Sequence, residues 1–225
     1  MGEAPRHTPF GRLPSADFAA LDRDGFLMLR GLAPADWLAP LCAAFDAGEL
    51  PNEAWPAPRG RDWRHALVDL DPVVQRVCRQ PVLLAGVGRI LGGAFFLIQV
   101  EGREPRPGGG AQGLHRDGAD PTRTEYASAL LFLDPFGPDN GATKVAPGSH
   151  RGAGLATRVL GGEAGDALLF DANLLHGATC NTSGARRRSL LITFAVEALR
   201  PSTEATRAVR SVRMDTSERF EPRFG

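Results

Sequence analysis

The sequence predicts an α+β protein whose N-terminal helices pack outside a double-stranded β-helix core, a jelly roll of the cupin-like type. Up to residue 92 the chain carries helix signals, such as the apolar side chains of Trp37, Leu41 and Phe45 at every fourth position. After residue 93 short runs rich in Leu, Phe, Val and Ile are separated by clusters of Gly, Pro, Asn and Asp. Such runs are typical of a β-sandwich or barrel.

The expected elements begin with a loose arm over residues 1–14, which show no periodicity. Ser15 can cap a short helix over 16–24 that ends at Gly25. An apolar run over 26–30 then predicts a buried strand.

Prolines mark the starts of the later helices, because proline fits the first helical turn. Helices are expected from Pro34, from the pair at 71–72 and from Pro81. Pro40 lies inside the first of these three and predicts a kink or a later start there.

Residues 48–64 are rich in Pro, Arg and Trp and lack a clean period. Loops of this length are uncommon unless they are functional or disordered. The segment is either a surface excursion held down by Trp55 and Trp63 or a lid over a substrate, and the sequence leaves both interpretations open. His65 beside it is interpreted as structural rather than catalytic.

The expected core strands are short apolar runs, and a flexible connection follows the first of them at 105–110. The runs cover residues 95–100, 127–133, 143–146, 166–170 and 190–196.

One domain is expected over the whole chain of 1–225. Its parts are the loose arm, a mainly helical part, the β-helix core and a tail, over residues 1–14, 15–92, 93–198 and 199–225. In the tail, the spacing of Arg207, Arg210 and Arg213 favours a solvated helix face over a flap folded across the site.

Composition argues against several classes of function. The formal net charge is +0 at pH 7, so nothing draws the chain to nucleic acid or to an anionic membrane. No apolar run is long enough to span a bilayer, and no signal peptide is visible. The 3 cysteines lack CxxC spacing, which argues against a disulfide framework and a thiolate zinc site. We therefore expect a cytoplasmic protein without a nucleic-acid or membrane partner, and a monomer or small homo-oligomer.

The stretch 113–118 carries the first chemical signal. His115 and Asp117 are two positions apart, so in an extended segment both side chains project to the same side. A His-x-Asp pair alone is weak evidence, since it occurs by chance in many proteins. Two His and one carboxylate on one face of a metal are the arrangement of non-haem Fe(II) oxygenases. His176 is the best candidate for the third ligand, and His150 is its rival.

Further motifs follow the His-x-Asp pair in order. They are NGAT at 140–143, PGSH at 147–150, GDALLF at 165–170, His176 and a run of arginines at 186–188. In this order and spacing the chain resembles the phytanoyl-CoA dioxygenase family of Fe(II)- and 2-oxoglutarate-dependent oxygenases. The resemblance covers about residues 15–198, and its motif-bearing part is 112–194.

The resemblance implies that Fe(II) is bound by His115, Asp117 and His176. It places the PGSH turn away from the metal, so His150 is expected to be structural. It also implies roles for 2-oxoglutarate and O₂ as cosubstrates.

Arg187 is implied as the partner of the distal carboxylate of 2-oxoglutarate. A planar fork of donors suits this task, because arginine can hold a carboxylate through two parallel bonds. Arg186 and Arg188 are rivals, which strand alternation would turn away from the barrel.

Gln112 and Thr143 are similar in position to polar residues that contact the cosubstrate in some relatives. Ordinary hydrogen bonding within the sheet is the alternative for both. Tyr126 is expected in a core strand, with the lining of a pocket as its alternative.

The expected reaction is the hydroxylation of a small organic metabolite, with release of succinate and CO₂. One alternative is a non-catalytic cupin-like binding protein, which predicts a degraded triad. Another is a metal enzyme on the same barrel that uses no oxo acid, which Arg187 argues against. Asp117 favours oxygenation over halogenation, because halogenating relatives carry a small residue at that position. The substrate stays open, as do desaturation, epoxidation and dealkylation.

Overall fold

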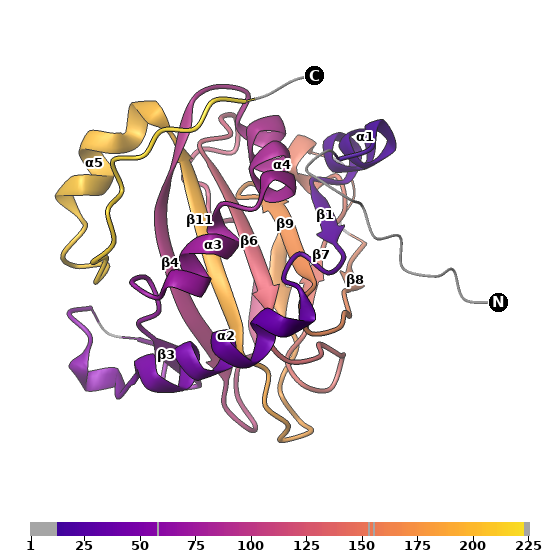
Figure 1. Ribbon diagram of the computed structural model, residues 1–225. Coiled ribbons are helices and arrows are strands. Elements are labelled where there is room, and N and C mark those ends of the chain that lie inside the picture. The colour runs from indigo at the N-terminus through magenta and orange to yellow at the C-terminus, as the bar shows by residue number, and fades with distance from the viewer. Residues whose placement is uncertain (1–12, 58, 153, 155, 223–225) are drawn as a thin grey trace.

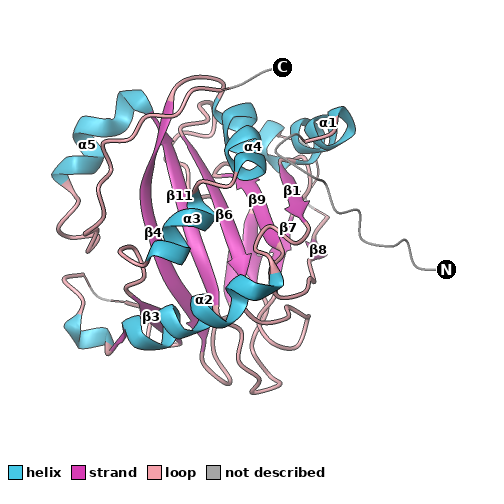
Figure 2. Cartoon of the chain, viewed as in Figure 1, coloured by secondary structure: helices cyan, strands magenta, loops and turns pink. Residues whose placement is uncertain are grey.

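The structure is a computed structural model that describes residues 13–57, 59–152, 154 and 156–222. Two sheets form its centre (Figures 1 and 2). The larger sheet has seven strands in the order β1-β9-β6-β11-β4-β3-β2, and the smaller has four in the order β5-β10-β7-β8. From β4 onward the chain passes back and forth between the two sheets, which confirms the predicted double-stranded β-helix.

The strands of the larger sheet are β1 (Phe26–Leu29), β2 (Glu49–Leu50), β3 (Trp63–Ala66), β4 (Phe95–Pro105), β6 (Tyr126–Phe132), β9 (Ala167–Asp171) and β11 (Ser189–Val196). Those of the smaller sheet are β5 (Gln112–His115), β7 (Thr143–Val145), β8 (Arg158–Val159) and β10 (His176–Ala178).

The strands expected from the apolar runs are all present, as β4, β6, β7, β9 and β11. β4 continues beyond its apolar run to Pro105, where a loop connection is expected to begin. The extension forms because residues 102–105 pair with β3 on one side while 101–103 pair with β11 on the other. The polar end of β4 is thereby held inside the sheet.

Helices cover one face of the larger sheet (Figure 1). They are α2 (Ala35–Gly48), α3 (Pro72–Cys78) and α4 (Pro81–Leu91), while α1 (Ser15–Asp24) packs beside β1 and α4. The main hydrophobic core lies between helices and sheet, with Leu41 and Phe45 of α2 and Leu83 of α4 fully buried. A second cluster joins Phe132 and Phe170 of the larger sheet to Val145 of the smaller, so it lies between the two sheets.

Two expected helix starts differ in detail. Pro14 occupies the N-cap of α1, and Ser15 is its first residue without a side-chain cap. α2 begins at Ala35, before Pro40, so the later start is wrong. Burial of the apolar stripe on both sides of the proline explains why the helix continues through it. The loose arm expected over 1–14 lies outside the described residues except for its last two positions.

The tail does not form the expected arginine-bearing helix face. The helix α5 (Arg200–Ala205) ends before Arg207. Arg207 donates to the backbone carbonyls of residues 212–214, and Arg210 donates to the carbonyl of Ile98 at 3.0 Å. Arg213 pairs with Asp69 at 2.6 Å. These arginines tie the tail to the body, because their forks of donors satisfy carbonyls and a buried carboxylate.

The described residues of the segment 48–64 are packed against the larger sheet. β2 and β3 add two edge strands to it, with a short 3₁₀ turn (Asn52–Ala54) and Trp55 between them. Trp55 is only 6% exposed. In the part of the chain that the structure describes, no helix is long and apolar enough to cross a membrane.

His65 on β3 is a buried imidazole with few polar groups around it. It lies edge-on to Trp55, with ring centroids 5.8 Å apart. Its Nδ1 is 3.9 Å from Glu101, and neither ring nitrogen has a hydrogen-bond partner among the described residues. Burial lowers the pKa of His65 from 6.5 to about 4; Glu101 opposes this shift, while Arg103 and Arg59 add to it. The ring is therefore neutral in the folded protein at neutral pH.

This burial predicts an acid-sensitive fold. The unfolded chain binds a proton at His65 near pH 6.5 and the folded chain only near pH 4, so the free energy of unfolding should fall as the pH drops between these values. At about 1.4 kcal/mol per pKa unit, the loss is on the order of 3 kcal/mol. Urea unfolding of His65→Leu should show a flatter pH profile over this range. A variant profile as steep as that of the wild type would contradict the assignment.

Candidate metal centre and cosubstrate pocket

The pairing of β5 with β10 brings two histidines together. β10 lies between β5 and β7 in the smaller sheet, and His176 at its start is the register partner of His115 at the end of β5. Their ring centroids are 4.4 Å apart. Just beyond β5, the backbone N–H of Asp117 donates to the carbonyl of Ala172 at 2.9 Å. This bond anchors Asp117 beside the two rings.

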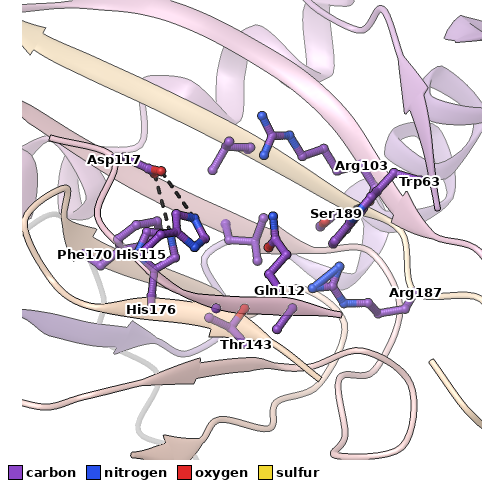
Figure 3. Close-up of a pocket in the computed structure, with 14 residues that line it drawn as sticks. Trp63, Arg103, Gln112, His115, Asp117, Thr143, Phe170, His176, Arg187 and Ser189 are labelled. Carbon is purple, nitrogen blue, oxygen red and sulfur yellow. Dashed lines mark hydrogen bonds and ion pairs between the residues drawn. The ribbon is translucent and has the colours of Figure 1, made fainter. Parts of the chain in front are cut away.

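The three side chains converge on one point (Figure 3). Nε2 of His115 lies 3.6 Å from Oδ1 of Asp117, and Nε2 of His176 lies 3.6 Å from its Oδ2; both distances are too long for hydrogen bonds. The three candidate ligand atoms all lie within 4.8 Å of one another. The two separations of 3.6 Å fit a metal ion bonded to each ligand at about 2.0–2.2 Å. Across the described residues, no other group of His, Cys, Asp and Glu side chains has this spacing.

Backbone carbonyls orient both imidazoles. Nδ1 of His115 is 3.0 Å from the carbonyl of Gly113, and Nδ1 of His176 is 3.0 Å from the carbonyl of Leu174. A carbonyl can only accept, so Nδ1 carries the proton and Nε2 presents its lone pair to the site. Burial lowers the pKa of His176, although the charge of Asp117 opposes this shift. The ring is therefore neutral, which is the form that binds metals.

The site is open on one side only. His176 is 8% exposed, whereas the side chains of His115 and Asp117 are 39% and 40% exposed. A bound ion would therefore have the protein on one face and an accessible space on the other.

His150 is placed elsewhere in the structure. Its Nε2 is 3.2 Å from the backbone carbonyl of Asp22. Its ring fills the space beside Gly25, where an added Cβ would come within 2.5 Å of Nδ1. His150 thus packs the short 3₁₀ helix η2 (Ser149–Arg151) onto the end of α1, away from the histidine pair.

Arg187 lies in the same cavity as the three candidate ligands. It is 2% exposed, and its Nε and Nη1 have no hydrogen-bond partner among the described residues. The guanidinium lies 4.1 Å from the ring centroid of Phe136 and 5.6 Å from that of Trp63. Burial, with the nearby charge of Arg103, lowers the pKa of Arg187 to about 9. The cavity therefore holds a buried cation whose donors are free to bind an anion.

The two neighbouring arginines are already paired. Arg186 donates to both carboxylate oxygens of Glu104, at 3.0 and 2.8 Å. Arg188 donates to both oxygens of Asp134, at 2.9 and 2.8 Å. Neither lines the cavity, so the alternation expected around Arg187 is present in the structure.

Gln112 on β5 and Thr143 on β7 also line this cavity. Their side chains make no hydrogen bond to any described residue. Only the backbone groups of these two residues take part in the hydrogen bonding of the sheet. Figure 3 shows the Gln112 amide lying between the histidine pair and Arg187.

Several cavity residues escaped the sequence reasoning. The walls include Trp63 of β3, Arg103 of β4, Phe170 of β9 and Ser189 of β11. Inward-facing positions alternate along β4 and β11, and this period of two was the available signal for them. The sequence did not indicate Arg103 as a cavity residue, because a Pro- and Gly-rich stretch that is typical of a loop follows it.

The phytanoyl-CoA dioxygenase (PhyH) family matches residues 21–189 of the chain. The multifunctional dioxygenase ausE of Penicillium brasilianum is 26% identical, over 98% of this chain and 86% of its own. L-proline trans-4-hydroxylase of Streptomyces griseoviridis is 27% identical, over 58% of this chain and 65% of its own.

Solved structures share the fold. HygX from Streptomyces hygroscopicus, crystallised with nickel and 2-oxoglutarate, superposes with a TM-score of 0.71 at 18% identity, covering 83% of this chain and 88% of its own. The α-ketoglutarate-dependent epimerase SnoN from nogalamycin biosynthesis superposes with a TM-score of 0.68 at 18% identity, covering 80% and 82%.

The fold, the converging triad and the family match define a non-haem iron dioxygenase that uses 2-oxoglutarate and O₂. The chain belongs to the phytanoyl-CoA dioxygenase family. Its substrate is a small molecule, and the resemblance seen in the motifs is confirmed.

Proposed function

We propose that Arg187 binds the distal carboxylate of 2-oxoglutarate while His115, Asp117 and His176 bind Fe(II). The observation that carries this proposal is the buried Arg187 guanidinium, which has unpartnered donors and faces the same cavity as the triad. An uncompensated buried charge is unfavourable. A dicarboxylate that spans from the metal to Arg187 would satisfy these donors through a charge-assisted pair.

The donor set also fits the metal. Two neutral imidazoles and one carboxylate on one face, with the opposite face accessible, are the ligands of a facial triad for Fe(II). Gln112 and Thr143 lie between the two ends of the cavity and supply further polar contacts to the cosubstrate.

Bound iron and 2-oxoglutarate supply the oxidising chemistry, in which O₂ is consumed and succinate and CO₂ are released. The residues of the chain hold and orient these groups. The carbonyls of Gly113 and Leu174 keep both Nδ1 atoms protonated. The rings of Phe136 and Trp63 shield Arg187 from water, which strengthens its attraction to a carboxylate.

The outcome we propose is hydroxylation of a small organic metabolite. Asp117 supports it, because the protein itself provides the anionic ligand and leaves no fixed position for a halide.

We further propose that the chain acts as one cytoplasmic domain, as a monomer or small homo-oligomer. One hydrophobic core joins the N-terminal helices to the larger sheet. Cys42, Cys78 and Cys180 are all free thiols, as in a reducing compartment.

The metal assignment predicts different effects for two histidines. Anaerobic protein incubated with Fe(II) and then desalted should retain one iron per chain by elemental analysis. His176→Ala should lose the iron because one of three ligands is gone, whereas His150→Ala should retain it. Equal loss in both folded variants would show that the wrong histidine has been assigned.

The cosubstrate assignment predicts that replacing Arg187 has opposite effects on 2-oxoglutarate affinity and on stability. Arg187→Leu removes an uncompensated buried cation, so the ligand-free protein should become more stable, by about 1 kcal/mol. The same change should weaken metal-dependent binding of 2-oxoglutarate far more than tenfold, because losing one partner of a buried charge pair costs about 2–5 kcal/mol. Urea unfolding and calorimetric titration measure the two effects.

Arg188→Leu is the matched control for this pair of effects. It leaves the carboxylate of Asp134 unpaired, so it should lower stability and leave 2-oxoglutarate affinity unchanged. The opposite pattern, with Arg188 as the position sensitive to 2-oxoglutarate, would transfer the role to that residue.

The reaction type is tested with a substrate found through substrate-dependent succinate formation. The enzyme is incubated with Fe(II), 2-oxoglutarate, excess chloride and ¹⁸O₂, and the product is examined by mass spectrometry. We expect a hydroxylated product that carries ¹⁸O. A chlorinated main product would refute the role given to Asp117.

A further inference from the structure

A second cavity adjoins the cosubstrate cavity. The two share Asp117, Arg103 and Leu191 as walls. The second cavity extends along the inner face of the larger sheet, between β4, β6 and β11. If the first cavity holds 2-oxoglutarate, as proposed above, the second is the space beside the metal that remains for the substrate.

Most of the residues that line this second cavity have polar side chains. Hydroxyl groups come from Tyr126 and Ser128 of β6 and from Thr193 of β11. Glu101 and Arg103 of β4 add a carboxylate and a guanidinium. An extended hydrocarbon chain would bury the three hydroxyls and the terminal nitrogens of Arg103 without hydrogen bonds, which costs about 1–3 kcal/mol for each group.

Glu101 is already bound by neighbouring side chains. It is 2% exposed, and Oε1 accepts from Nε of Arg103. Its Oε2 accepts from the Gln99 amide at 2.9 Å and lies 3.1 Å from Nη2 of Arg59. Arg103 and Arg59 hold the pKa of Glu101 below its ordinary value despite burial. The carboxylate is thus ionised and bound to the side chains of its neighbours.

Arg103 has hydrogen-bond donors without partners among the described residues. Its Nε is bound to Glu101, while its two terminal nitrogens make no hydrogen bond to any described residue. The side chain is 34% exposed and borders both cavities. Figure 3 shows its guanidinium directed towards the side on which Asp117 lies. Fixed at Nε by Glu101, Arg103 presents its free edge to the space beside the metal.

The charges around the second cavity favour an anion. Glu101 is outnumbered by Arg59 and Arg103, and Arg210 adds a third guanidinium behind the wall through its bonds to Ile98 and Gln99. Asp117 would be neutralised by a bound metal. Arg123 and Glu125, which line neither cavity, form an ion pair with each other at 3.1 Å.

We propose that the substrate is a polar small molecule with an oxyanion group, a carboxylate or a phosphate ester, and that Arg103 binds this group. The guanidinium fork matches either oxyanion. The hydroxyl-bearing residues of β6 and β11, farther along the same sheet face, then bind the polar remainder of the substrate. A fatty acyl group is disfavoured in this space because it offers neither the charge nor the hydrogen bonds.

The test measures binding without turnover. The protein is loaded with Mn(II) and N-oxalylglycine, an unreactive analogue of 2-oxoglutarate, and calorimetry gives the affinity of that analogue. The loaded protein is then screened by thermal shift against hydroxylated and aminated carboxylic acids, their primary amides, phosphate monoesters and acyl-CoA thioesters. Dissociation constants are measured for the compounds that bind.

We expect acids or phosphate esters to bind at least tenfold more tightly than their uncharged counterparts. The two anion classes in the screen show which group is the natural one. In Arg103→Gln this preference should disappear, and Arg103→Lys should retain part of it. Arg123→Gln removes the same charge from an exposed position that is paired with Glu125 and lines neither cavity, so it should leave the preference intact.

Four results would overturn the inference. They are equal binding of acids and amides, tightest binding of acyl-CoA thioesters, no binding of any acid or phosphate at millimolar concentration, and an anion preference that survives in Arg103→Gln. A more than tenfold loss of N-oxalylglycine affinity in Arg103→Gln, with the preference retained, would assign Arg103 to the cosubstrate instead. Failure of wild-type protein to bind Mn(II) and N-oxalylglycine would refute the proposed function itself and this inference with it.

Discussion

The pairing of β10 with β5 is the constraint on which the candidate metal centre depends. The register of an antiparallel pair decides which side chains meet, and a slip of one residue would turn His176 to the other face of the sheet. β10 has only three residues, and β7 pairs with all of them from the other side. A short strand enclosed between two neighbours therefore holds its histidine opposite His115, and the backbone bond of Asp117 to Ala172 brings in the carboxylate.

The larger sheet has the main hydrophobic core on one face and the two cavities on the other. Along β4, Val100 and Gly102 face the helices, while Glu101 and Arg103 face the cavities. Gly102 permits the close approach of α2, because a Cβ at this position would lie 2.7 Å from the ring of Phe45. The outer face can thus be packed tightly without restricting the polar inner face, since successive side chains of a strand point to opposite sides.

The three arginines at 186–188 differ in whether they have a carboxylate partner. The outer two members each have a carboxylate partner, whereas Arg187 is buried against aromatic rings with free donors. An unpaired buried cation lowers stability, and such local costs are found at binding sites, where a ligand removes them. On the proposed assignment, the ligand-free chain keeps a destabilised group in the position where the distal carboxylate of 2-oxoglutarate would bind.

The sequence by itself determined the class of fold and the His115–Asp117 pair, because strand alternation and turn residues are local properties that neighbouring positions carry. The order of motifs added Arg187 and the family. The resemblance already favoured His176 over His150, and only the tertiary structure shows the reason, which is that β5 lies beside His176 whereas His150 packs against the end of α1. The same holds for Arg103 as a wall of both cavities and for the tail arginines, whose partners at residues such as Asp69 are far away in the chain. Contacts of this kind depend on which strands and loops become neighbours, and that is fixed by packing of the whole core rather than by any local pattern.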